Sequence, residues 1–244
     1  MRRAFTLTEL VVVISLIIIM SGLSVPAIHS YLLNRDQTLA VQVFSGAVTN
    51  AQALARANFT TTAIRVEQAF ATDEAGRMLR DALGQPRWLD HQRVEILAVG
   101  MRQPQKPIAG EELVFRRLVH VPAVNVPSSA WLAPDNALSL LASGNTAYQP
   151  AAPGTAAIDT LDTFYLAFNR QGRLVRLPAS RLIYLDERQD NALIGHPQPS
   201  CSGAVAYNRA RFEKSGRDPR WLRSGIALYV GQRTGSVIGA ESAR

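Results

Sequence analysis

The hydrophobic and polar positions divide the chain into an apolar beginning and a long mixed remainder. From Val11 to Leu33 the sequence contains no Asp, Glu, Lys or Arg, and Arg2 and Arg3 precede this run. About 20 consecutive apolar residues are enough to cross a bilayer as a helix. The pattern therefore predicts a membrane-spanning helix over 5–33, with a cytoplasmic N-terminus set by the two arginines.

Beyond this run the helical pattern continues but becomes amphipathic. Apolar residues recur with the three- and four-residue spacing of one helix face: Ala40, Val43, Phe44, Ala47, Ala51, Leu54 and Ala55. Because many of them are alanine, this face can approach a sheet closely. We expect one helix from about Phe5 to Asn58, whose second half, 34–58, packs on the rest of the protein. A break into two helices at Pro26 is the alternative.

The remaining residues, 59–244, predict a domain made mainly of β-strands. Runs rich in β-branched or alternating apolar residues lie at 60–70, 93–99, 112–121, 163–168, 174–177, 181–185, 226–230 and 236–238. Gly172 and Gly235 would supply positive φ angles in two hairpin turns. A short helix is expected at 75–83. Residues 122–160, rich in Pro, Ala, Ser and Asn, predict a long surface insertion with a short helix near 137–142. The fold class is therefore α+β, with a long N-terminal helix packed on an antiparallel β-sheet head domain.

Charge adds one candidate binding feature. The chain has 244 residues, a net charge of +7 and a pI of about 10.2, which favours anionic partners such as phospholipid or nucleic acid. One segment concentrates basic residues, with Tyr207, Phe212 and Trp221 between them: Arg209, Arg211, Lys214, Arg217, Arg220 and Arg223. Arginines could bind phosphates there while the aromatic rings stack on bases. The simpler interpretation is a solvated basic edge.

Catalytic and metal-binding motifs are absent from the sequence. There is no phosphate-binding loop, no nucleophile elbow and no His-Glu-x-x-His. Cys201 is the single cysteine, so no disulfide forms within the chain, and the four histidines are scattered. We expect no enzyme activity, no cofactor and no metal.

The first residues carry a family resemblance. Ala4-Phe5-Thr6-Leu7-Thr8-Glu9-Leu10, followed by the apolar run, resembles the leader and mature start of type IV prepilins and type II secretion pseudopilins. The resemblance implies a leader at 1–4, cleavage by prepilin peptidase between Ala4 and Phe5, and N-methylation of Phe5. It implies roles in subunit assembly for Glu9 and Pro26. Ala4 stands where the family usually has Gly. A secretory signal peptide and a plain signal anchor are the alternatives, but neither explains Glu9.

Glu9 has a physical reason to matter. A carboxylate that is buried among packed apolar helices needs a cation as its partner. After cleavage, the new amino group of Phe5 would be such a cation. It could belong to a neighbouring subunit, or to the same chain, since Phe5 and Glu9 are four residues apart on a helix.

The end of the helix and the first strand narrow the resemblance. Residues 51–58 are rich in Ala and Arg and run into Thr61-Thr62-Ala63-Ile64-Arg65-Val66, as in the GspH/FimT group of minor pseudopilins. This implies a pilin-like fold, an inner-membrane anchor with a periplasmic head, and later assembly into a pseudopilus or pilus. Its partners would be other subunits, the prepilin peptidase/methyltransferase and an inner-membrane assembly platform. The alternatives are a DNA-binding minor pilin for DNA uptake and a membrane-anchored domain that never assembles.

Overall fold

The computed structural model describes residues 7–74, 77–84, 87–99, 113–118, 120–137, 163–179, 182–186, 192–195, 199–232, 234 and 236–240. Three helices are described in these ranges, α1 (Leu7–Ala57), α3 (Arg209–Lys214) and α4 (Pro219–Arg223). The strands are β1 (Thr62–Phe70), β2 (Trp88–Val99), β3 (Leu113–Arg117), β4 (Val124–Asn125), β5 (Ala130–Pro134), β6 (Phe164–Phe168), β7 (Leu174–Val175), β8 (Leu182–Asp186), β9 (Ala192–Gly195), β10 (Gly203–Asn208), β11 (Ile226–Val230) and β12 (Val237–Ala240).

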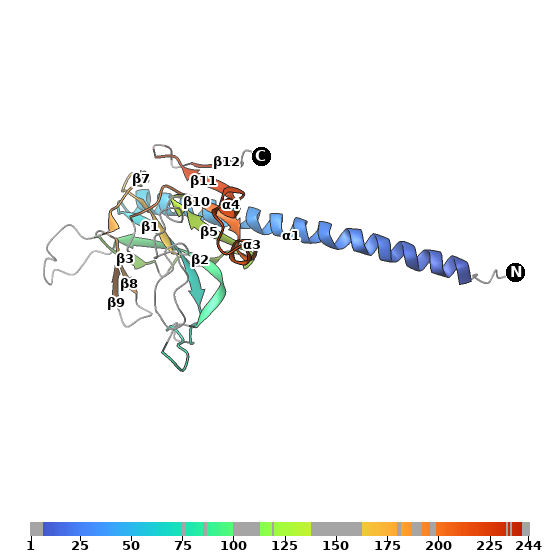
Figure 1. Ribbon diagram of the computed structural model, residues 1–244. Coiled ribbons are helices and arrows are strands. Elements are labelled where there is room, and N and C mark those ends of the chain that lie inside the picture. The colour runs from blue at the N-terminus through green and yellow to red at the C-terminus, as the bar shows by residue number, and fades with distance from the viewer. Residues whose placement is uncertain are drawn as a thin grey trace.

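Helix α1 is one element with two different halves. Its first half extends away from the β-domain, and its second half lies against it (Figure 1). The buried face of the second half is apolar and consists mostly of alanine. It includes Ala40, Phe44 and Ala51, each fully buried. The helix ends at Ala57, and two residues later Phe59, with a left-handed φ of 48°, turns the chain out of the helical path.

The larger sheet has the strand order β7-β6-β1-β2-β3-β8-β9, with β4 paired to β2. Its pairs are antiparallel except β3 with β8, which run parallel from Leu113↔Leu182 to Arg116↔Leu185. The sheet is therefore mixed. The pairing between β3 and β8 joins strands that are far apart in the sequence, and local hydrophobic patterns carry no information about such a partner.

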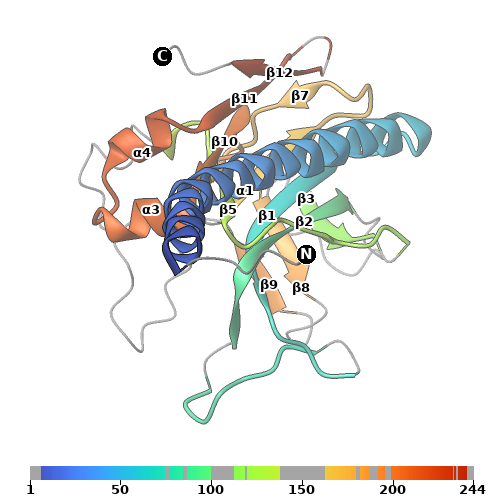
Figure 2. The same ribbon diagram turned by 90° about the vertical axis from the view of Figure 1, so that its right-hand side faces the viewer.

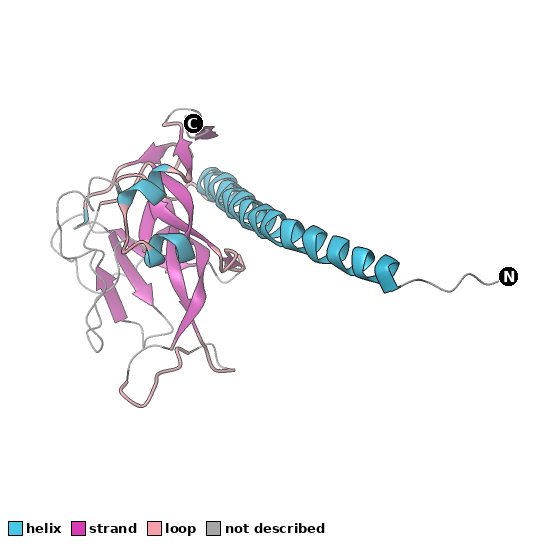
Figure 3. Cartoon of the chain, turned by 45° about the vertical axis from the view of Figure 1, so that its right-hand side comes forward, coloured by secondary structure: helices cyan, strands magenta, loops and turns pink. Residues whose placement is uncertain are grey.

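The smaller sheet is antiparallel, in the order β12-β11-β10-β5. One buried side chain ties it to the larger sheet: the Gln92 amide donates to the carbonyl oxygen of Leu132 at 2.9 Å and accepts from the Leu132 N–H at 2.7 Å. The second half of α1 contacts strands of both sheets, which curve around it (Figure 2). The cartoon in Figure 3 shows the same arrangement from an intermediate direction.

Two expectations about the fold and location were wrong. Among the residues that the structure describes, no helix is both long enough and apolar enough to cross a bilayer. This contradicts a membrane-spanning first half and a single-pass location in the inner membrane. The expectation of a pilin-like head with an antiparallel sheet was also wrong. The β-domain is curled like half a barrel, and its larger sheet contains the parallel pair β3 and β8.

The expected insertion at 122–160 contributes to the core where it is described. Strand β5 is buried along its whole length and pairs with β10 from Ala130↔Asn208 to Pro134↔Ala204. Because both of its faces are buried, β5 shows no alternation of polar and apolar residues that would mark it as a strand. The helix expected near 137–142 lies mainly outside the described residues. The described part of 75–83 forms no helix but a ribbon that includes the bridge Thr72↔Met78.

Candidate functional site

The first half of α1 is an exposed apolar surface. Every side chain from residue 7 to residue 22 is exposed, and the exposed fraction of the large apolar ones runs from 44% at Val13 to 79% at Leu7. Apolar residues occupy all sides of the helix here, so no single stripe faces the domain. A helix that is apolar on all sides is normally buried by other structure. The isolated chain therefore presents a surface suited to contact with further apolar helices.

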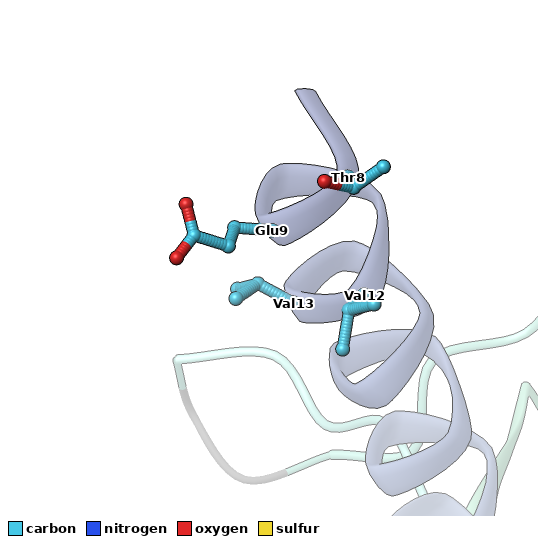
Figure 4. A pocket seen from close by; sticks show the side chains of 4 residues that line it. All are labelled: Thr8, Glu9, Val12 and Val13. Atoms are coloured by element: carbon cyan, nitrogen blue, oxygen red, sulfur yellow. The ribbon is translucent and has the colours of Figure 1, made fainter. Parts of the chain in front are cut away.

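Glu9 lies in the first turn of this surface. It lines a shallow depression with Thr8, Val12 and Val13, and its side chain extends on the same side of the helix as Val13 (Figure 4). A carboxylate in the first turn is favoured by the positive end of the helix dipole. Ala4 and Phe5, the expected cleavage and methylation site, lie outside the described residues. Position 26 lies within α1, but the side chain of Pro26 is not among those described.

The basic segment folds into α3 and α4, which cover part of the smaller sheet. Asn208 caps α3 by accepting from the Arg211 N–H, and Asp218 caps α4 by accepting from the Arg220 N–H, each at 2.9 Å. Phe212 is fully buried, with its ring 5.2 Å from that of Tyr207, which is buried as well. These two rings are core residues, so the expectation that they stack on bases was wrong.

Several of the six basic side chains already have partners. The guanidinium of Arg209 lies 3.5 Å from the centre of the Trp131 ring. Arg217 pairs with Glu213 at 3.1 Å, and Arg220 pairs with Asp218 at 2.8 Å.

One of the remaining cations of the segment, Arg211, lies beside an exposed aromatic ring. Arg211, Lys214 and Arg223 are exposed and take part in no described ion pair within 4 Å. Arg211 lies 5.7 Å from the ring of Trp221, which is 38% exposed. In the described part of the chain, two of the six basic side chains, Arg217 and Arg220, thus have a carboxylate beside them, and the other four have no described ion pair.

A buried charged cluster on β1 and β2 was not foreseen. Arg65 and Glu67 lie opposite Glu95 and Arg93 in the antiparallel register, and all four side chains are buried. Arg93 donates to Glu67 at 2.8 and 2.5 Å, Arg65 pairs with Glu67, and Arg93 lies 3.4 Å from Glu95. The Arg65 guanidinium also stacks 4.2 Å from the Tyr184 ring. The sequence signal was the pair of alternating stretches 65–67 and 93–95, each Arg-Val-Glu.

This cluster is electrostatically balanced. Burial is the largest single effect and disfavours the charge on Arg65, but Glu67, Tyr165, Glu95 and Tyr184 together outweigh it and raise the pKa of Arg65 above its ordinary value. The Nε and Nη1 atoms of Arg65 have no hydrogen-bond partner in the described part of the chain. Two arginines and two glutamates leave the cluster with no net charge to attract a ligand, so its role is to hold the two strands together.

Metal and thiol chemistry have no centre in the described part of the chain. The described ranges contain no group of three or more His, Cys, Asp or Glu side chains arranged to hold a metal ion. Cys201 is 4% exposed, and burial raises the pKa of its thiol to about 12. A thiol that stays protonated at neutral pH is a poor nucleophile.

The strongest functional candidate is therefore the exposed half of α1 with Glu9, and the second is the surface around Trp221. Comparison with protein-family models, with curated proteins and with solved structures gives no match to this chain.

Proposed function

We propose that the chain is a minor pilin or pseudopilin subunit, which prepilin peptidase processes and which assembles into a type II secretion pseudopilus or a type IV pilus. The observation that carries the proposal is the exposed, all-round apolar first half of α1, which projects from the β-domain with Glu9 in its first turn. The sequence Phe5-Thr6-Leu7-Thr8-Glu9 supports the same assignment.

The energetics of burial favour assembly through this helix. Burying a large aliphatic side chain contributes about 1.5–3 kcal/mol, and α1 exposes many of them between Leu7 and Met20. In a bundle made of the first halves of several copies, each helix would cover its neighbours on all sides. The β-domain, which uses only the second half of α1 for its own core, would remain outside the bundle.

Glu9 would set the register of such a bundle. Packing helices around Glu9 would remove its carboxylate from water, which is costly unless a cation is close. The amino group of a processed Phe5 is the cation expected there. Removing one partner of a buried ion pair costs about 3–5 kcal/mol, which corresponds to a loss of more than about a hundredfold in affinity.

The test is incorporation of a Glu9→Ala variant into filaments. The variant is produced beside the wild-type chain in cells that carry an active prepilin peptidase and the matching assembly system. We expect the filament fraction to lose the variant by tenfold or more, whereas Thr8→Ala, from the same depression, is incorporated normally. Equal incorporation of Glu9→Ala and wild type would refute the pairing.

Processing is tested separately by mass spectrometry of the N-terminal peptide from the same cells. The proposal requires a mature chain that begins with N-methylated Phe5. Recovery of the intact Met1–Ala4 leader in cells with active peptidase would show instead a domain that does not enter a filament.

A second candidate function, nucleic-acid capture, is favoured by one observation. Arg211 lies beside the exposed ring of Trp221, and Lys214 and Arg223 are exposed on the same segment. Such a combination suits phosphate contacts and base stacking. We expect Trp221→Ala to weaken binding of single-stranded DNA at low salt at least tenfold, and Trp88→Ala, also an exposed tryptophan, to leave it unchanged. Equal binding by both variants would exclude this site.

A further inference from the structure

The last strand, β12, is an outer strand without the usual protection. It pairs with β11 on one side, and no described strand pairs with its other side. It lies at the periphery of the domain in Figures 1 and 2. Edge strands of natural proteins commonly carry charges or proline that prevent pairing with another chain. Residues 236–240, Ser-Val-Ile-Gly-Ala, contain neither.

The register shows which backbone groups face the open edge. Tyr229 lies opposite Ile238, and two residues further along, the Gly231 N–H donates to the Ser236 carbonyl at 2.9 Å. Hydrogen-bonded pairs alternate along an antiparallel ladder. Ile238 therefore directs its N–H and C=O toward β11, while Val237 and Gly239 direct theirs to the open edge. Gly239 is exposed, and a Cβ atom there would meet no atom within 4 Å.

The side chains beside this edge form a small apolar patch. Ile238 is 57% exposed and Tyr229 is 49% exposed, and they face each other across β11 and β12. The apolar cluster under α3 and α4 is formed with residues of β5 and β10, such as Trp131 and Tyr207. Ile238 and Tyr229 lie on this face of the smaller sheet, which we call the outer face, but outside that cluster, and they are left exposed.

We propose that β12 pairs antiparallel with β12 of a second copy of the chain, with the twofold axis at Ile238. Val237 of each copy would then lie opposite Gly239 of the other, and their outward N–H and C=O groups would form four hydrogen bonds. The two Ile238 side chains would meet on the outer face beside the two Tyr229 rings. The two small sheets would become one continuous sheet across the pair.

Charge favours a second copy at this edge over the outer strand β7. Each chain carries a net charge of +7, so two copies repel wherever basic residues meet. Strand β7, at one edge of the larger sheet, is flanked by the exposed residues Arg173 and Arg176. The outer side of β5 is occupied by the Gln92 amide. Strand β12 contains no charged residue, and the residues directly before and after it are Ser236 and Glu241 rather than arginines.

The contact is small, and this decides how it must be detected. Interfaces below about 1,200 Å² are typical of weak or transient association. A four-residue strand pair with one apolar contact belongs to that class. Covalent trapping is therefore the appropriate measurement.

The trapping experiment uses the full chain with Ile238→Cys under mild oxidation. In a non-hydrogen-bonded antiparallel pair the two Cα atoms are about 4.5 Å apart, within the range of a disulfide. Tyr229→Cys is the matched control on the same face. Because β11 is one strand further from the axis in each copy, its two Cα atoms would be about 14 Å apart. The natural Cys201 is buried and does not compete.

We expect Ile238→Cys to form a disulfide-linked dimer at least tenfold faster than Tyr229→Cys. Association driven by the α1 helices affects both variants equally, so the ratio reports on β12 alone. This inference does not rest on the proposed function. Equal rates for the two variants would overturn the pairing.

A second variant tests the hydrogen bonds. Adding Gly239→Pro to the Ile238→Cys chain removes an N–H that points to the open edge and is not used by β11, so the fold should be retained. Circular dichroism verifies this. The rate of disulfide formation should fall at least tenfold; an unchanged rate in the folded double variant would also overturn the proposal.

Discussion

Replacing Gln92 with leucine should show how much the hydrogen bonds between the two sheets contribute to the stability of the protein, apart from the apolar core around them. Gln92 is fully buried, and its amide makes both a donated and an accepted hydrogen bond with the backbone of Leu132 in β5. Leucine has a similar volume but no polar group. The substitution therefore removes the two bonds without leaving a large cavity.

The expected loss of stability follows from the backbone groups of Leu132 that lose their hydrogen-bond partners. The N–H and C=O of Leu132 would stay buried without their partner, since Leu132 is itself fully buried. Each unsatisfied buried group costs about 1–3 kcal/mol, and the more apolar side chain offsets part of this. We expect the free energy of unfolding to fall by about 2–4 kcal/mol.

The assay is urea unfolding followed by tryptophan fluorescence. Trp131 precedes Leu132 in β5 and is fully buried, so its emission reports on this region. A loss of this size lowers the urea midpoint by about 1 M or more if the slope of the transition is unchanged. Gln68→Leu is the matched control. Gln68 lies opposite Gln92 in the β1–β2 register, is only half-buried, and donates one side-chain hydrogen bond to the Leu89 carbonyl at 2.8 Å.

The Gln68→Leu control should lower the free energy of unfolding by about 1 kcal/mol or less, the usual net contribution of one hydrogen bond. Comparable losses for the two variants would show that the Gln92 amide does not hold the sheets together. A smaller loss for Gln92→Leu than for Gln68→Leu would refute the reasoning altogether.

Three further predictions concern single residues. Gly172 has a φ of 71°, and a Cβ there would lie 2.6 Å from Nε of Arg56, so Gly172→Ala should destabilise the chain in urea by more than Gly216→Ala, which has a φ of 72° but open space. Equal losses of stability in the two variants would show that the Arg56 side chain moves aside at no cost. The Cys201 thiol, with its pKa raised to about 12, should react with a thiol reagent at pH 8 at least ~100-fold more slowly in the folded chain than in concentrated urea; similar rates would contradict its burial. Hydrogen bonds from the side chain and backbone of Arg220 lower the pKa of Asp218 below 3.8. Its contribution to stability is therefore present above that pH and lost as the pH falls through the lower folded pKa. Asp218→Asn should reduce the acid sensitivity of unfolding, and an unchanged pH profile would contradict this.

The sequence predicted those parts of the fold that depend on local patterns. Strands β1, β2, β6, β8, β11 and β12 overlap runs of alternating or β-branched residues, and the positive φ of Gly172 was expected from its hairpin. Gly235, the other glycine for which a positive φ was expected, lies outside the described residues. Strands β5 and β10 were not predicted, since both are buried along their whole length and show no polar–apolar alternation.

Features that depend on long-range pairing could not be predicted from one sequence. The parallel contact of β3 with β8 and the bond from Gln92 to Leu132 join residues that are far apart in the chain. The structure also changes the interpretation of the aromatic residues in the basic segment. Only the tertiary structure shows that Phe212 is buried, and that Asp218 and Glu213 neutralise two of the arginines.

The buried Arg and Glu side chains of β1 and β2 have a consequence for how the chain folds. A slip of the two strands by two residues would place Arg65 opposite Arg93, or Glu67 opposite Glu95, so that like charges would meet away from water. A slip by one residue would turn the charged side chains toward α1 and the apolar core. Only the native alignment puts opposite charges opposite each other. The cluster thus excludes competing alignments of the central hairpin while the sheet is forming.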